Sequence, residues 1–148
     1  MNLEILLLII PALGVLALLF TWWKTQEINA TPEGSERMAK IAASIQEGAM
    51  AFLKAEYRIL FLFVACIAVL LYWSGSNNEN SHALVAVSFA MGAFCSALAG
   101  YLGMKVATKA NVRTANAAKD SLGKALEVAF SGGAVMGLGV VGLGILGL

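Results

Sequence analysis

Four long apolar runs constrain this chain more than any other feature of its sequence. They cover about residues 3–23, 53–73, 83–104 and 128–148. Each approaches the ~20 residues that a helix needs to cross a hydrocarbon core about 30 Å thick. The chain is 59% apolar and only 13% charged, whereas soluble domains are about 45–50% apolar and about 25% charged. The sequence therefore predicts an all-α, integral membrane helical bundle with four transmembrane helices.

The distribution of lysine and arginine predicts the orientation of these helices. Five lie between the first two spans and five between the last two: Lys24, Arg37, Lys40, Lys54, Arg58, and Lys105, Lys109, Arg113, Lys119, Lys124. The N-terminus and the loop after Trp73 carry none. Because positive loops stay in the cytoplasm, we expect a multi-pass protein of the cell or inner membrane. Both basic segments are then cytoplasmic, and the N-terminus and residue 148 are outside.

The second and third helices are expected to extend into the cytoplasm. The apolar stretch 59–73 gives only about 22 Å of helix, so the second span must recruit residues back to about Leu53. Thr31 as N-cap and Pro32 at the first helical position predict one helix from about residue 32 to 73, which would be about 63 Å long. The third helix, with Ser81 as a possible cap, is expected to continue to a break at residues 120–123.

A charged stripe marks the entry of the second helix into the membrane. Lys40, Glu47, Lys54 and Arg58 lie within about 20° of one direction on a helical wheel. The simplest interpretation is a solvated face, with Lys54 and Arg58 reaching the interface. Alternatively, the stripe faces another part of the same protein and its charges pair there. A catalytic role for Glu47 has little support, since no partner acid, histidine or metal cluster accompanies it.

A basic stripe follows the third span. Lys105, Lys109 and Arg113 recur every four residues. Anchoring at the membrane surface, with attraction to anionic lipid, explains this pattern most simply. An electropositive rim that draws a phosphate-bearing anion to a cytoplasmic site is the alternative. The sequence contains neither GxxxxGK[ST] nor a strand–GxGxxG–helix pattern.

The remaining reactive side chains predict no catalytic or metal site. Cys66 and Cys95 lie inside apolar runs without CxxC spacing, so we expect small buried hydrophobes. His82 stands alone at the outer end of the third span, where a solvated interfacial position is expected. No acidic residue lies at the middle of a span, where one would mark an ion path.

The last span is unusually rich in glycine, reading "SGGAVMGLGVVGLGILGL". Gly133 and Gly137 form a GxxxG pair, and GLG recurs every five residues. Glycine lets helix backbones approach closely in lipid. We therefore expect Gly133, Gly137 and Gly142 to be helix-packing positions, in a span wedged between other helices.

Three ordered stretches carry a family resemblance. "IQEGAMAFLKAEYRIL", "GMKVATKANVRTANAA" and "ALEVAFSGGAVMGLGVVGLGILGL" together resemble the N-terminal part of a membrane-bound, ion-translocating pyrophosphatase. The resemblance implies a homodimer that hydrolyses pyrophosphate with Mg²⁺ and exports H⁺ or Na⁺, with membrane lipids around it. It leaves a requirement for K⁺ open and implies no nucleic-acid partner.

The resemblance also implies what these residues lack. Members of the family are several times longer, and their aspartate-rich catalytic stretch follows the fourth span. We therefore expect residues 1–148 to be a single transmembrane segment of a larger domain, to carry no catalytic or metal-binding residue, and to be inactive alone. The alternative is a stand-alone four-span scaffold or assembly protein without catalytic activity.

The predicted orientation can be checked by cysteine labelling. With Cys66 and Cys95 replaced by alanine, Asn78→Cys should react with an impermeant reagent from outside and Lys119→Cys only from inside, because an odd number of spans separates them. Labelling of both positions from the same side would contradict the span count.

Overall fold

The computed structural model describes residues 3–77 and 84–147, and every regular element in these ranges is an α-helix. The helices are α1 (Leu3–Ala30), α2 (Glu36–Asn77), α3 (Leu84–Ala117) and α4 (Leu122–Leu146). All four are long and apolar enough to cross a membrane. The predicted all-α fold with four candidate spans is confirmed. Ser81 and His82 lie outside the described residues.

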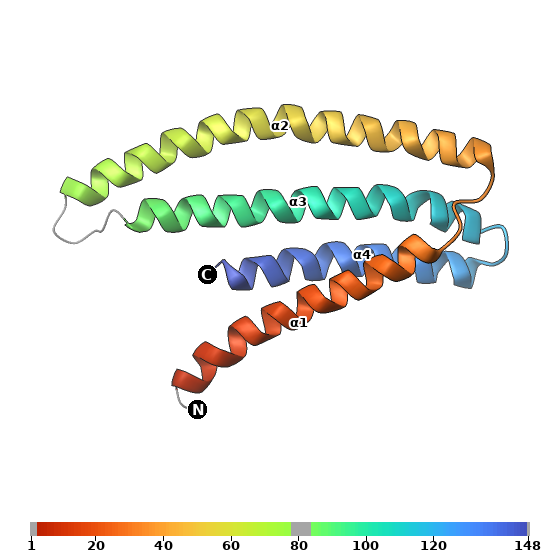
Figure 1. Ribbon diagram of the computed structural model, residues 1–148, viewed down its shortest axis with the longest axis horizontal. Coiled ribbons are helices and arrows are strands. Elements are labelled where there is room, and N and C mark those ends of the chain that lie inside the picture. Colours follow the sequence, from red (N-terminus) through yellow and green to blue (C-terminus); the bar gives the residue numbers. More distant parts are fainter. Residues whose placement is uncertain (1–2, 78–83, 148) are drawn as a thin grey trace.

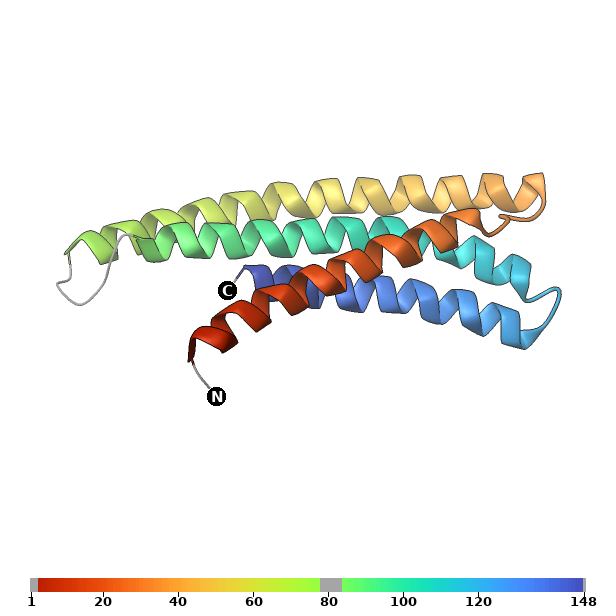
Figure 2. The ribbon, with the colours of Figure 1, turned by 60° about the horizontal axis from the view of Figure 1, so that its bottom comes forward.

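The helices run alternately up and down, so that both short turns lie at one end of the molecule (Figure 1). We call this the turn end; it comprises the turns at residues 31–35 and 118–121 and the helix residues beside them. Among the described residues, α2 packs only on α3, whereas α1, α3 and α4 pack on one another. Figure 2 shows α2 and α3 side by side, with α1 and α4 beyond α3. The chain therefore forms a three-helix unit with α2 attached along one side.

The start of α2 differs from the prediction. Thr31 and Pro32 do not begin the helix; α1 continues to Ala30, and Thr31 N–H donates to the Ile28 carbonyl at its end. Gly34 then reverses the chain at φ +94°, a conformation that an L-residue with a side chain rarely adopts. Ser35 takes the capping position, since its hydroxyl accepts from Met38 N–H at 3.4 Å. The prediction was wrong because the left-handed Gly34 follows Thr31 and Pro32 and prevents the helix from starting there.

α2 has the predicted length, but it begins and ends four residues later than predicted. Its 42 residues correspond to about 63 Å, and the 34 residues of α3 to about 51 Å. Both exceed the ~30 Å hydrocarbon core, so each must project beyond it. The break after α3 covers residues 118–121, so it begins two residues earlier than predicted, and Gly123 lies inside α4. Ser121 caps α4 by accepting from Lys124 N–H at 3.2 Å.

Small side chains bring α1, α3 and α4 together. A buried cluster of Ile28, Val106, Ala110 and Val135 joins the three helices. A Cβ added to Gly132 would lie 2.8 Å from Ala110 Cβ, and one added to Gly142 would lie 3.0 Å from the Gly14 carbonyl oxygen. Such contacts leave no room for a larger residue. Close backbone approach of this kind is how helices pack in lipid.

The contact between α2 and α3 includes a half-buried hydrogen bond. Leu53 is buried on the α3 side of α2. One turn further on, the Tyr57 hydroxyl donates to the Ala97 carbonyl at 2.6 Å. A Cβ on Gly100 would lie only 2.9 Å from the same hydroxyl. The small residues of α3 therefore make room for the tyrosine ring.

The packing role of Gly142 can be tested by one methyl group. Gly142→Ala should lower the unfolding midpoint of the full-length protein in detergent, by the equivalent of about 1–3 kcal/mol for overpacking, because its Cβ would meet the Gly14 carbonyl and the Leu18 side chain. Gly48→Ala is the control, since a Cβ there meets nothing within 4 Å, and alanine favours an exposed helix by up to ~1 kcal/mol. Equal midpoints for the two variants would contradict the proposed contact.

Candidate functional site

Arg113 lies at the centre of the turn end and is only 6% exposed. Its Nε donates to the Thr31 carbonyl and its Nη2 to Glu33 Oε1, each at 2.9 Å. Its Nη1 donates to the Lys109 carbonyl, also at 2.9 Å. The rigid guanidinium fork suits several acceptors at once. Arg113 therefore fastens the α1–α2 turn to α3.

Two neighbours on α3 hold the same turn. Lys109 Nζ donates to Asn29 Oδ1 at 3.2 Å, and Asn116 Nδ2 donates to the Pro32 carbonyl at 3.4 Å. Asn116 also approaches Gly34 so closely that a Cβ there would lie 2.5 Å from Asn116 Oδ1. Gly34 is thus required both by its backbone conformation and by this neighbour.

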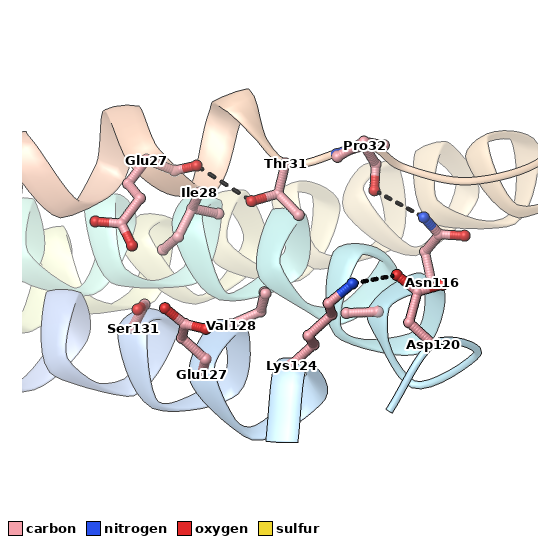
Figure 3. Close-up of a pocket in the computed structure, with 11 residues that line it drawn as sticks. Glu27, Ile28, Thr31, Pro32, Asn116, Asp120, Lys124, Glu127, Val128 and Ser131 are labelled. Atoms are coloured by element: carbon pink, nitrogen blue, oxygen red, sulfur yellow. Dashed lines mark hydrogen bonds and ion pairs between the residues drawn. The ribbon is translucent and has the colours of Figure 1, made fainter. Parts of the chain in front are cut away.

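A polar groove of about 360 Å³ opens beside these contacts, between the end of α1 and the start of α4. Figure 3 shows its acidic side chains, Glu27, Asp120 and Glu127, which come from α1, the α3–α4 turn and α4. Lys124 Nζ forms an ion pair with Asp120 Oδ2 at 3.0 Å. The sequence analysis missed this grouping, because no spacing rule brings residue 27 next to residue 127.

The groove does not form a metal centre. Over residues 3–77 and 84–147, no three carboxylate, cysteine or histidine side chains come together to hold an ion.

The basic stripe of α3 has three different environments. Lys105 is exposed, with its Nζ 5.7 Å from the Tyr101 ring centroid. Lys109 is half-buried against α1, and Arg113 is buried in an ion pair. The three residues are equally spaced in sequence, but the neighbouring segments bury their side chains to different degrees, which the spacing alone could not show.

The charged stripe of α2 faces away from α3. Lys40, Glu47, Lys54 and Arg58 are all exposed. Among the described residues they form no ion pair with one another, and Lys40 pairs instead with Glu36 at 3.2 Å. Whether this face meets solvent or another part of a longer protein stays a prediction.

The glycines of α4 divide into two groups. Gly142 is buried against α1, and Gly132, which the sequence analysis did not single out, is buried against α3. A Cβ added to Gly133 or Gly137 would meet nothing within 4 Å among the described residues. A packing role for Gly133 and Gly137 therefore stays a prediction.

Removal of the Arg113 fork should loosen the α1–α2 turn. Arg113→Ala should cost about 1.5–3 kcal/mol, the range for hydrogen bonds to a charged group, and should make residues 31–35 cleavable in limited proteolysis of the full-length protein. Arg37→Ala is the matched control, because Arg37 is exposed and such surface changes stay within about 0.5 kcal/mol. Unchanged cleavage of the turn in Arg113→Ala would show that Arg113 does not hold it.

Comparison with known proteins assigns the chain to a family. The family described as inorganic H⁺ pyrophosphatase matches residues 15–148. A K⁺-insensitive pyrophosphate-energized proton pump of Moorella thermoacetica is 49% identical over 132 residues, which are 89% of this chain and 19% of that protein. A K⁺-stimulated pyrophosphate-energized sodium pump of Thermotoga maritima is 44% identical over 119 residues, 79% of this chain and 16% of that protein.

This chain thus spans less than a fifth of the length of these relatives. The family match covers α1 from residue 15 onward and the whole of α2, α3 and α4, including the turn end with Arg113. The chain therefore belongs to the inorganic H⁺ pyrophosphatase family, of which it is an N-terminal portion.

Proposed function

We propose that this chain is the outer-helix portion of a pump that hydrolyses pyrophosphate on the cytoplasmic side and exports H⁺ or Na⁺. The observation that carries the proposal is the family match over residues 15–148. The relatives include both proton and sodium pumps, and both K⁺-insensitive and K⁺-stimulated types. Mg²⁺ as cofactor and a homodimeric full-length protein belong to the same proposal.

The turn end is proposed to be cytoplasmic, with the N-terminus outside. The described basic side chains support this orientation, since they lie on the helix portions that lead into the two turns. Two lysines also lie over aromatic rings: Lys24 is 5.2 Å from Trp23 and Lys105 is 5.7 Å from Tyr101. Aromatic residues concentrate at membrane interfaces. These pairs support the proposal that α1 and α3 leave the hydrocarbon at this level.

Within such a pump, this portion would serve as a scaffold. Arg113 and its neighbours would hold the α1–α2 turn on α3. The ends of α2 and α3, which are longer than the bilayer is thick, would project from it as a rigid helix pair. The charged stripe of α2 would help to position this helix pair. Lys105 and Lys109 would give its surface a positive charge. Chemistry would reside in the remainder of the full-length protein.

The open glycines of α4 support a further contact in the full-length protein. Gly133, Gly137 and Gly144 lie within about 40° of one another on the helix, and a Cβ on any of them would meet nothing within 4 Å. Each glycine in a helix costs about 1 kcal/mol relative to alanine. A second close helix on this face would offset that cost. We propose that another membrane-spanning helix of the pump packs there.

Phosphate release tests the proposed activity. The full-length protein, purified in detergent, should release phosphate from magnesium pyrophosphate in the presence or the absence of K⁺, and in vesicles it should move H⁺ or Na⁺ outward. Residues 1–148 alone are the control and should release none, because the described residues bring no three metal-ligating side chains together.

No release by the full-length protein under either K⁺ condition would contradict the proposed pump. Release by residues 1–148 alone would contradict the assignment of the chemistry to other spans.

A further inference from the structure

An apolar groove of about 400 Å³ lies between α1 and α3, with α4 as its floor. The two helices meet near the turn end and diverge toward the N-terminus of α1, as both ribbon views show (Figures 1 and 2). The volume falls within the roughly 300–1,000 Å³ typical of small-molecule sites. The groove walls include Leu18, Trp22, Leu98 and Leu102.

Both walls change from apolar to polar toward the turn end. On α3, Leu98, Leu102, Lys105 and Lys109 lie within about 60° of one direction. On α1, Leu18, Trp22, Thr25 and Asn29 likewise share one face, within about 60°. Lys109 Nζ donates to Asn29 Oδ1 at 3.2 Å and so links the two walls. Neither lysine lines the groove itself. Both follow its α3 wall toward the turns, and we call this side its cationic end.

The two lysines at this end differ from the paired cations nearby. Lys24, Lys40, Arg113 and Lys124 each have a carboxylate partner. Among the described residues, neither Lys105 nor Lys109 forms an ion pair. A pair of uncompensated ammonium groups at the membrane surface attracts anionic headgroups, at about 1 kcal/mol per lysine.

Aromatic residues place the cationic end of the groove at headgroup level. Trp22, which lines the groove, is 64% exposed, and Tyr101 lies beside Lys105. Tryptophan and tyrosine favour the membrane–water interface. Gly133, Gly137 and Gly144 lie on the opposite side of α4 from Gly139, which lines the groove floor. A helix packed on that glycine face would therefore leave the groove open to lipid.

We propose that this groove binds an anionic phospholipid. One acyl chain lies along Leu98, Leu102 and Trp22, and the phosphate lies near the ammonium groups of Lys105 and Lys109. The proposal rests on the membrane placement of these helices and not on pyrophosphate hydrolysis. It assigns a bound lipid to a defined site, beyond general attraction to the membrane surface.

Native mass spectrometry of the delipidated full-length protein can test the site. Phosphatidylglycerol and phosphatidylcholine with the same acyl chains are the probes. We expect one phosphatidylglycerol to bind more tightly than phosphatidylcholine. The double variant Lys105→Gln with Lys109→Gln should weaken that binding by roughly 30-fold, which is two lysines at about 1 kcal/mol each. Lys54→Gln is the matched control, since Lys54 is exposed on α2, away from the groove, and it should leave this site unchanged.

Leu102→Trp is a second variant that fills the groove without changing charge, and it should abolish binding of both lipids at this site. A photo-crosslinker at position 102 should attach to lipid. Attachment to another protein segment would show that a helix covers the groove and would overturn the proposal. Unchanged phosphatidylglycerol binding in the double lysine variant would also overturn it, as would displacement of the lipid by inorganic phosphate alone. Phosphate release remains a separate measurement, so failure of the lipid site leaves the proposed pump function untouched.

Discussion

Close backbone approach at α4 holds the three-helix unit together. Between helices in lipid there is no hydrophobic driving force, so association depends on van der Waals packing and hydrogen bonds. Gly142 lies against Gly14 of α1, and Gly132 lies against Ala110 of α3. The buried cluster around Ile28 and Val135 forms where these contacts bring the helices close. Without this approach, α1 and α3 would have only their own limited contact.

A different interaction acts beyond the apolar part of the helices. There the chain must reverse between α1 and α2, and the turn carries backbone carbonyls that need donors. Arg113 supplies three hydrogen bonds to acceptors of the turn and of α3, and Lys109 and Asn116 add contacts on either side. Glycine packing therefore holds the helices together within the lipid, and the hydrogen bonds of Arg113 hold them together at the turn end.

The sequence predicted the elements well because their causes are local. Apolar runs of spanning length and a predicted break at residues 120–123 were enough to give four helices and their approximate ends, although the turn itself lies at residues 118–121. It misplaced the start of α2, since Thr31, Pro32 and Ser35 all carry helix-start signals and only Gly34 decides among them. From the glycine pattern it selected Gly133, Gly137 and Gly142, whereas the described contacts use Gly132 and Gly142.

What the sequence by itself determined was the class of protein, the number of spans and the family, because hydropathy, charge and ordered motifs are read along one chain. What only the tertiary structure decided was which charges are buried and which remain free. Arg113 and Lys105 have the same spacing pattern, yet one is bound to the α1–α2 turn and the other is exposed beside Tyr101. That difference arises from residues about 80 positions away in sequence, which no local pattern can place.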